Sequence, residues 1–165
     1  MIEISVLNSG CEMWKTVADY AEKCSWRAGK QLSTLMHTNA FKYWERVIAT
    51  FEDGEPVGFC TLTEKDELPP DLPYTPFIGF VFIEEEHRGK RLSEKMIRKA
   101  IENAGTLGYD KLYLMSGETG LYEKYGFRYI DDLETIYGDT EQLYCISTHD
   151  QEVDDQWRNS YLSRK

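Results

Sequence analysis

The sequence predicts a mixed α/β (α+β) domain built on one mixed sheet with helices packed against it. Two strand-like runs flank Asp53-Gly54, and this dipeptide between β-rich segments is a strong hairpin signal. A largely apolar run, Phe77–Ile83, leads through a charged turn into an amphipathic helix, Leu92–Leu107. Further short strand-like runs follow that helix, so helical connections are predicted to join strands of the same sheet.

The first half of the chain is predicted to hold a strand, two short helices and the hairpin. The first helix places Val17, Ala18 and Ala21 at helical spacing, and the segment Trp26–Gly29 interrupts the helical pattern. The predicted elements are the strand Ile2–Leu7, the helices Met13–Lys23 and Gln31–Thr38, and the hairpin strands Tyr43–Phe51 and Pro56–Thr63.

The second half begins with a predicted exposed loop, because Lys65–Pro76 carries four of the five prolines. In the helix that follows the charged turn, apolar residues share one face, and Glu94 and Arg98 form an i,i+4 pair on the other. The predicted elements are the strand Phe77–Ile83, the helix Leu92–Leu107, the strand Lys111–Met115, the helix Leu121–Tyr125, and the strands Phe127–Ile130 and Gln142–Ser147.

Composition predicts one globular domain, residues 1–148, followed by a polar tail, residues 149–165. The chain has 29 acidic and 19 basic residues and a net charge of −10, which argues against general binding to nucleic acid or anionic membranes and suits a cationic substrate such as an amine. No apolar run reaches the roughly 18 residues that span a bilayer, and the N-terminus lacks the pattern of a signal peptide. The four cysteines and three histidines are too scattered for a disulfide framework or a metal site, so we expect a cytoplasmic protein with no metal.

The charged turn before the long helix is suited to binding a phosphate group. Backbone N–H groups at the start of a helix are unpaired, and the helix dipole favours an anion there. Two nucleotide-binding motifs are excluded. A P-loop needs a glycine five residues before Gly89-Lys90 and a Ser or Thr where Arg91 stands, and a Rossmann turn needs G-x-G-x-x-G.

This turn resembles the pyrophosphate loop of the GNAT superfamily of acyl-CoA-dependent N-acetyltransferases, whose pattern is Arg/Gln-x-x-Gly-x-Gly/Ala at the start of a long helix. The corresponding stretch is Arg88-Gly89-Lys90-Arg91-Leu92-Ser93. Arg91 and Ser93 stand where the family has small residues. Ser93 is still small, and a helical φ is open to the larger Arg91, which adds positive charge. The segment Gly120–Phe127 is similar to the LYEK-x-GF element that closes the same family's cofactor site. The resemblance covers about residues 43–147.

The resemblance implies a mostly antiparallel sheet with one splayed parallel strand pair, and acetyl-CoA as co-substrate. By position, Phe82 and Ile83 would face Leu114 and Met115 across the splay, and a backbone N–H near Phe82 or Ile83 would polarise the thioester carbonyl. Tyr122 would be the acid that protonates the leaving thiolate, because a phenol is protonated at neutral pH. The cofactor-binding residues that it implies are Phe82, Ile83, Arg88, Gly89, Lys90, Arg91, Leu92 and Ser93.

The implied reaction is direct attack of a primary amine, of a small molecule or a peptide, on the acetyl group in a ternary complex. An alternative from another class is a non-catalytic acyl-CoA-binding or interaction module on the same fold. Arg91 and the lack of a carboxylate in Thr75–Ile83 favour that alternative.

The sequence leaves the general base, the acceptor contacts and the oligomeric state open. Glu84, Glu64, Asp66 and a water chain are all candidates for the base. An acceptor pocket is expected between the N-terminal helices and the sheet, and the aromatic and basic residues that could line it are Trp26, Arg27, Phe41, Tyr43 and Trp44. The sequence is compatible with a homodimer.

Overall fold

The structure is a computed structural model that describes residues 1–149. One seven-stranded sheet runs through this part of the chain, with the strands in the order β1-β2-β3-β4-β5-β7-β6. All neighbouring strands are antiparallel except β4 and β5, which are parallel. The predicted mixed, mostly antiparallel sheet is therefore confirmed. The strands are β1 Ile2–Leu7, β2 Arg46–Glu52, β3 Glu55–Thr63, β4 Phe77–Ile83, β5 Lys111–Ser116, β6 Arg128–Glu134 and β7 Thr140–Ser147.

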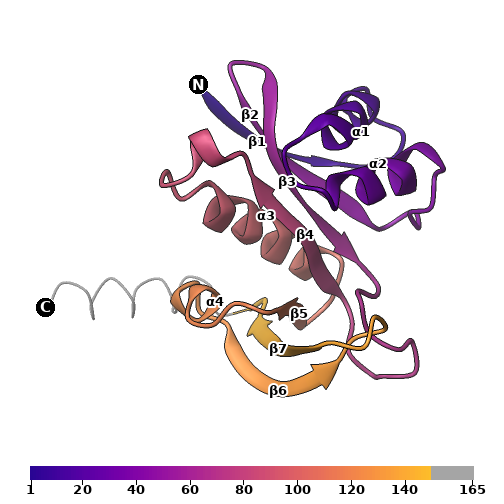
Figure 1. Cartoon of the computed structure of the whole chain (residues 1–165), viewed down its shortest axis with the longest axis vertical. Helices are drawn as coiled ribbons and strands as arrows, with labels where there is room; N and C mark the ends of the chain where they lie inside the picture. The colour runs from indigo at the N-terminus through magenta and orange to yellow at the C-terminus, as the bar shows by residue number, and fades with distance from the viewer. Residues whose placement is uncertain (150–165) are drawn as a thin grey trace, which may run out of the picture.

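Helices cover both faces of the sheet (Figure 1). One apolar core joins α1 and α2 to β2, β3 and β4, and a second core joins α3 to the opposite face. No helix among residues 1–149 is long and apolar enough to cross a membrane. The predicted tail beyond His149 lies outside the described residues. The helices are α1 Met13–Lys23, α2 Gly29–His37, the 3₁₀ turn η1 Glu85–His87, α3 Leu92–Thr106 and α4 Leu121–Lys124.

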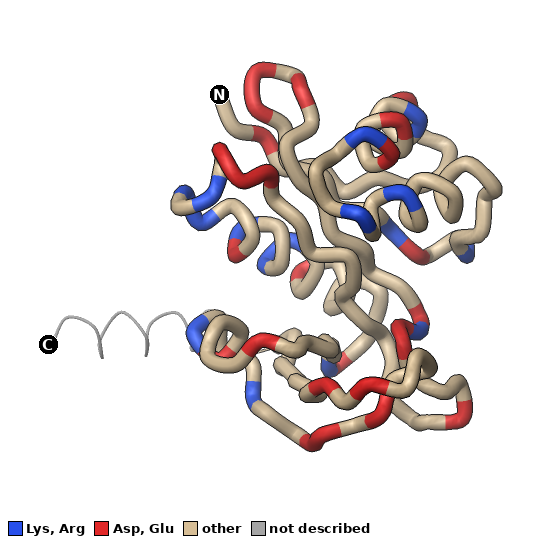
Figure 2. The backbone as a smooth tube through the Cα atoms, in the orientation of Figure 1, with Lys and Arg blue, Asp and Glu red and all other residues tan. Residues whose placement is uncertain are grey.

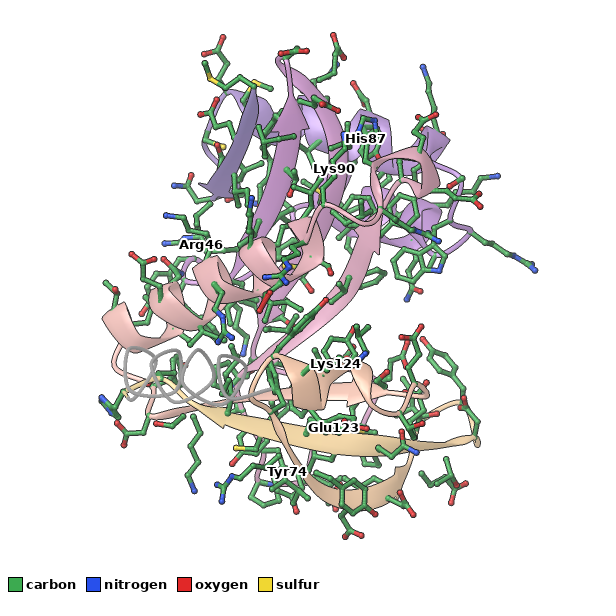
Figure 3. All side chains as sticks on the ribbon, turned by 90° about the vertical axis from the view of Figure 1, so that its left-hand side faces the viewer. Arg46, Tyr74, His87, Lys90, Glu123 and Lys124 are labelled. Carbon is green, nitrogen blue, oxygen red and sulfur yellow. The ribbon has the colours of Figure 1, made fainter. Side chains whose placement is uncertain are left out.

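The hairpin between β2 and β3 confirms the Asp53-Gly54 signal. Both residues have positive φ, 51° and 85°, as a two-residue turn matched to the strand twist requires. The tip of this hairpin contacts the turn that precedes α3, because the Glu52 carboxylate lies 2.6 Å from His87 Nδ1 and 3.5 Å from Lys90 Nζ. His87 and Lys90 both lie in this turn (Figure 3). The hairpin therefore supports the turn that the sequence singled out.

The second helix begins two residues earlier than predicted. A turn starts at Trp26, whose carbonyl accepts a hydrogen bond from Gly29 N–H at 3.0 Å, and α2 begins at Gly29, so the predicted break is confirmed for residues 26–28. Gly29 is a packing glycine, because a Cβ there would lie 2.4 Å from the carbonyl oxygen of Ala21 in α1. The glycine thus allows α1 and α2 to approach closely.

Two further predictions differ from the structure in the second half of the chain. The strand β6 extends to Glu134, past the predicted end at Ile130, because it is an edge strand whose Asp131 and Asp132 face solvent while its backbone pairs with β7. The loop between β3 and β4 is not simply exposed, since Leu68 is buried and packs with Phe77 and Leu143. This packing brings the start of the loop against the sheet.

Candidate active site

The sheet opens where β4 and β5 part. The two strands pair only at Phe77 with Tyr113 and at Ile78 with Leu114. Beyond Ile78, β4 continues to pair with β3 alone. The predicted register is therefore wrong, since Leu114 lies opposite Ile78 and not opposite Phe82 or Ile83. Because a strand directs alternate N–H groups to its two sides, the parting leaves β4 backbone groups turned toward an open gap.

A backbone irregularity in β4 lies beside this gap. Phe80 has φ of 49°, in the left-handed region that non-glycine residues rarely adopt, and the pairing of β3 with β4 shifts register at the same place. A bulge of this kind turns neighbouring side chains onto the same face. Gly79 faces the loop after β3, and Phe80 packs its ring against Trp26 at a centroid distance of 6.1 Å.

A cavity of about 260 Å³ occupies the gap. Residues of β4, β5, α2, α4 and the loop after β3 all line it. Four of the lining residues are carboxylic acids, and acidic residues also run along the neighbouring β6–β7 hairpin (Figure 2). The lining residues used below are Trp26, Asp66, Glu67, Gly79, Phe80, Glu118, Tyr122 and Glu141.

The turn at the start of α3 exposes backbone donors. Gly89 has φ of 87° and Arg91 has φ of 60° with ψ of 27°, so both residues are left-handed. Arg91 therefore does not adopt the right-handed helical φ that is open to it. No side chain caps the N-terminus of α3, and a Cβ at Gly89 would meet nothing within 4 Å. This turn thus offers uncapped N–H groups and open space, as an anionic pyrophosphate requires.

Most side chains of the same turn already have partners within the protein. Arg88 donates through Nε to the Ile83 carbonyl at 2.9 Å and lies over the Phe82 ring. Lys90 lies 3.5 Å from the Glu52 carboxylate at the hairpin tip. Ser93 Oγ is 2.9 Å from the Tyr125 hydroxyl, which ties α3 to α4. Arg91 is exposed and forms no ion pair among the described residues, so its charge is the one most available to a ligand.

The side chains of Leu92, Phe82 and Ile83 are buried in the apolar cores. Leu92 and Ile83 pack beneath α3, while the Phe82 ring stacks on Trp26 at 5.7 Å between centroids. Any contact of these three residues with a ligand would therefore be made by the backbone. The Ile83 carbonyl is already engaged by Arg88, so its amide is the group left for a ligand.

Tyr122 lies on α4 and reaches the cavity from the opposite side of the gap. Its ring is 8% exposed and packs against the rings of Tyr125, Phe127 and Tyr144. Tyr144 donates to the Glu118 carbonyl at 3.2 Å, and Glu123 accepts from Gly120 N–H at 2.8 Å (Figure 3), so the turn before α4 is fixed at two points. Burial, followed by the charge of Glu118, raises the pKa of Tyr122 above its ordinary value. The phenol is therefore protonated across the neutral range.

Residues 12–127 match the family model described as the acetyltransferase (GNAT) family. The chain belongs to this family. No curated protein matches the sequence. The resemblance stated from the two motifs is thus confirmed, and the GNAT family uses acetyl-CoA as its acyl donor.

Solved structures share the GNAT fold with this chain at low sequence identity. A GNAT-family protein from Desulfovibrio desulfuricans aligns with a TM-score of 0.67 and 12% identity, covering 88% of this chain and 99% of the other. A spermidine/spermine N-acetyltransferase from Vibrio cholerae aligns with a TM-score of 0.63 and 17% identity, covering 93% and 99%. A GNAT-family acetyltransferase from Elizabethkingia anophelis with acetyl-CoA bound gives 0.60 and 17%, covering 88% and 97%.

The structure separates the three carboxylates that the sequence left open as the base. Glu84 accepts hydrogen bonds from the Tyr20 hydroxyl and the Ser25 hydroxyl, each at 3.0 Å, so it anchors the α1–α2 connection. Glu64 is paired with Lys42, which lowers the Glu64 pKa. Asp66 lines the cavity. Burial, and then the charge of Glu67, raise the pKa of Asp66 to about 7.

Of the five residues expected to line an acceptor pocket, Trp26 and Phe41 line a cavity. Trp26 lines the cavity in the gap, and Phe41 lines a second cavity of about 180 Å³ beside it. Arg27 and Tyr43 are exposed, and Trp44 packs on Tyr109 in the α3 core. The sequence did not single out Glu67, Glu118 or Glu141, because their approach to the gap depends on strand order and loop packing.

Proposed function

We propose that this GNAT protein transfers the acetyl group of acetyl-CoA to the nitrogen of a primary amine, by direct attack in a ternary complex. The observation that carries the proposal is the shared gap. Open backbone groups of β4 and Tyr122 border one cavity where the sheet parts, and the uncapped start of α3 follows the end of β4 in the chain. The acceptor is a small-molecule or peptide amine, and the reducing cytoplasm suits the four free thiols of Cys11, Cys24, Cys60 and Cys145.

The residues of the turn would hold the donor by its phosphates. The N–H groups of Gly89, Lys90, Arg91, Leu92 and Ser93 would face the pyrophosphate, as at other helix N-termini that bind anions. The Arg91 guanidinium would add positive charge there. Arg88 would act indirectly, because its bond to the Ile83 carbonyl and its position over Phe82 hold the end of β4.

The reacting carbonyl would lie in the gap between β4 and Tyr122. An amide of β4 near Phe82 or Ile83, turned to the open side, would stabilise the negative charge that develops on the carbonyl oxygen. The Tyr122 hydroxyl would donate to the sulfur as the carbon–sulfur bond breaks. A raised pKa makes this phenol a weak acid, so its main contribution would be a hydrogen bond to the thiolate.

The charge of the cavity favours a cationic acceptor. Glu67, Glu118 and Glu141 line it together with Asp66, and none of the lining residues within 1–149 is a lysine or arginine. Burial raises the pKa of Glu67 and of Glu141, and neighbouring carboxylates add to both shifts. A bound ammonium group would relieve this repulsion.

Release of the CoA thiol across a panel of primary amines tests the proposal. We expect turnover with at least one alkyl amine and stabilisation of the protein by CoA in a thermal shift assay, since a ligand that binds the native state raises its apparent stability. CoA stabilisation without turnover for any amine would instead favour the alternative, a non-catalytic acyl-CoA-binding module. The left-handed Arg91 is the observation that keeps this alternative in view.

A further inference from the structure

We propose that Asp66 removes the proton from the acceptor ammonium. Strand β4 contains no carboxylate, so the base would come from the loop after β3. This inference rests on the proposed function. It adds the group that accepts the proton, which the two motifs of the sequence do not supply.

The position of Asp66 is the first argument. The cavity in the gap and the smaller cavity of about 180 Å³ share only two lining residues, Asp66 and Phe80. Asp66 Oδ1 lies against Gly79, since a Cβ built on that glycine would be 3.3 Å from it. Gly79 is the first β4 residue beyond the last pair with β5. The carboxylate therefore lies where the sheet opens, between the larger cavity and the smaller cavity toward Phe41.

The loop holds Asp66 in place. Lys65 Nζ donates to the carbonyls of Leu72 and Tyr74 at 2.7 and 3.0 Å, and so it closes the loop on itself. Thr63 Oγ1 donates to the Lys65 carbonyl at 2.9 Å, and Thr75 Oγ1 donates to the Glu64 carbonyl at 2.7 Å. These bonds fix the backbone within three residues of Asp66 and join it to residues 72–75 at the far end of the loop. A base held this way needs little rearrangement to meet a substrate.

The surrounding charges are the third argument. The ionisable groups facing the larger cavity with Asp66 are Glu67, Glu118, Tyr122 and Glu141, and those facing the smaller one are Glu45 and Lys65. The Lys65 ammonium is committed to the two carbonyls, and Glu45 accepts from the N–H groups of Lys42 and Glu64. No salt bridge to Asp66 forms among the described residues. Its pKa of about 7 leaves it able both to take a proton and to release it near neutral pH.

The proton balance requires one such group. The acceptor ammonium loses one proton to the Asp66 carboxylate and becomes a neutral amine with a free electron pair. That pair forms the carbon–nitrogen bond as the carbon–sulfur bond breaks. The nitrogen loses its second proton as the amide forms, the thiolate gains one proton, and Asp66 returns its proton to solvent, so one proton is released for each acetyl group transferred.

The test compares Asp66→Asn with Asp71→Asn, which removes an exposed carboxylate from the same loop. With an alkyl amine as acceptor, we expect kcat/KM of wild type to rise with pH through about 7. In the Asp66→Asn variant we expect a loss of about 10²- to 10⁴-fold and no rise at this pH. Asp71→Asn should match wild type. CoA should still stabilise Asp66→Asn in a thermal shift assay, which separates lost catalysis from lost folding.

A second acceptor distinguishes a base from a group that only binds or positions the substrate. An alkoxyamine is already neutral at pH 7 and needs no base, so Asp66→Asn should lose far less activity with it than with the alkyl amine. Equal losses with both acceptors, or an unchanged pH profile in Asp66→Asn, would overturn the role of Asp66 while the proposed function stands. Loss of the rise in kcat/KM near pH 7 in Glu141→Gln, with the rise retained in Asp66→Asn, would also overturn the role of Asp66. If wild type acetylates no amine at all, the proposed function fails and the base fails with it.

Discussion

Arg91 is the residue whose replacement best separates backbone geometry from charge in the donor site. It has φ of 60° and ψ of 27°, and this left-handed conformation costs a residue with a Cβ about 1–2 kcal/mol. Glycine has no such cost, although it loses more conformational entropy on folding, by about 0.4–1 kcal/mol. Arg91→Gly should therefore stabilise the fold by roughly 0.5–1 kcal/mol relative to wild type. Arg91→Ala keeps the Cβ and its cost, and should leave stability nearly unchanged.

The two variants lose the same charge, so donor binding should weaken in both. The Arg91 side chain is exposed, and a single exposed ionic contact contributes about 0.2–1 kcal/mol. We therefore expect the Kd for CoA to rise by up to about fivefold in Arg91→Ala at moderate salt. The effect should shrink at high salt, because salt screens exposed charges. Arg91→Gly should bind no more weakly than Arg91→Ala, since glycine allows the backbone a closer approach to phosphate.

Thermal unfolding and CoA titration measure these two effects independently. For a domain of this size, about 1 kcal/mol corresponds to roughly 2–4 °C in Tm. The expected result is a Tm for Arg91→Gly that exceeds that of Arg91→Ala by a few degrees, with similar CoA affinities. Equal Tm values would show that residue 91 is not left-handed in solution. Unchanged affinity in both variants at low salt would refute the role of the Arg91 charge.

Three further outcomes are expected. Tyr122→Phe should lower kcat about 10²-fold, at the low end of the range for a general acid because the raised pKa makes Tyr122 a weak one, with CoA affinity retained; full turnover would remove it from the mechanism. Ser93→Ala and Tyr125→Phe each remove the same 2.9 Å contact between the two hydroxyls, so a double-mutant cycle should give a coupling of about 1 kcal/mol in unfolding free energy. A CoA affinity that falls only in Ser93→Ala would mean that Ser93 contacts the donor directly. The pKa of Asp66 in the folded protein is raised to about 7 from 3.8, so its ionisation destabilises the fold, and wild-type stability is lost as pH rises between about 4 and 7. The Tm of Asp66→Asn should therefore exceed that of wild type by a margin that grows across this window. A margin that does not depend on pH would contradict the raised pKa.

Local patterns predicted most of the fold because they act over short stretches of chain. The β4 bounds, Phe77–Ile83, match the prediction, since an apolar run ends there at a charged turn. The Asp53-Gly54 turn is right for the same reason, because its two positive φ values are a property of two residues. The predicted break is right for residues 26–28, but Gly29 belongs to the helix. Gly29 lets α1 and α2 approach because a Cβ there would meet the Ala21 carbonyl oxygen, and the helical pattern alone does not specify that neighbour.

The proposed donor half of the site rests on local patterns, as the hairpin does. The groups proposed to bind phosphate come from the single stretch Arg88–Ser93, and Tyr122 lies in a second compact motif, so both can be proposed from spacing along the chain. Two details within that stretch still required coordinates. The left-handed φ of Arg91 and the bond from Arg88 to the Ile83 carbonyl both depend on how the turn joins the end of β4.

The acceptor half of the site depends on distances that no motif encodes. Glu64, Asp66 and Glu84 are chemically similar candidates in the sequence, and what separates them is the partner that each meets in the fold. Lys42 neutralises Glu64, and hydroxyls from the α1–α2 connection hold Glu84. Asp66 meets the irregular part of β4 and other carboxylates, and burial and repulsion raise its pKa to about 7. It forms no salt bridge within residues 1–149. The ionised Asp66 carboxylate would be stabilised by a positive charge, which the residues around it do not provide. A protonated amine that enters the cavity would provide that charge.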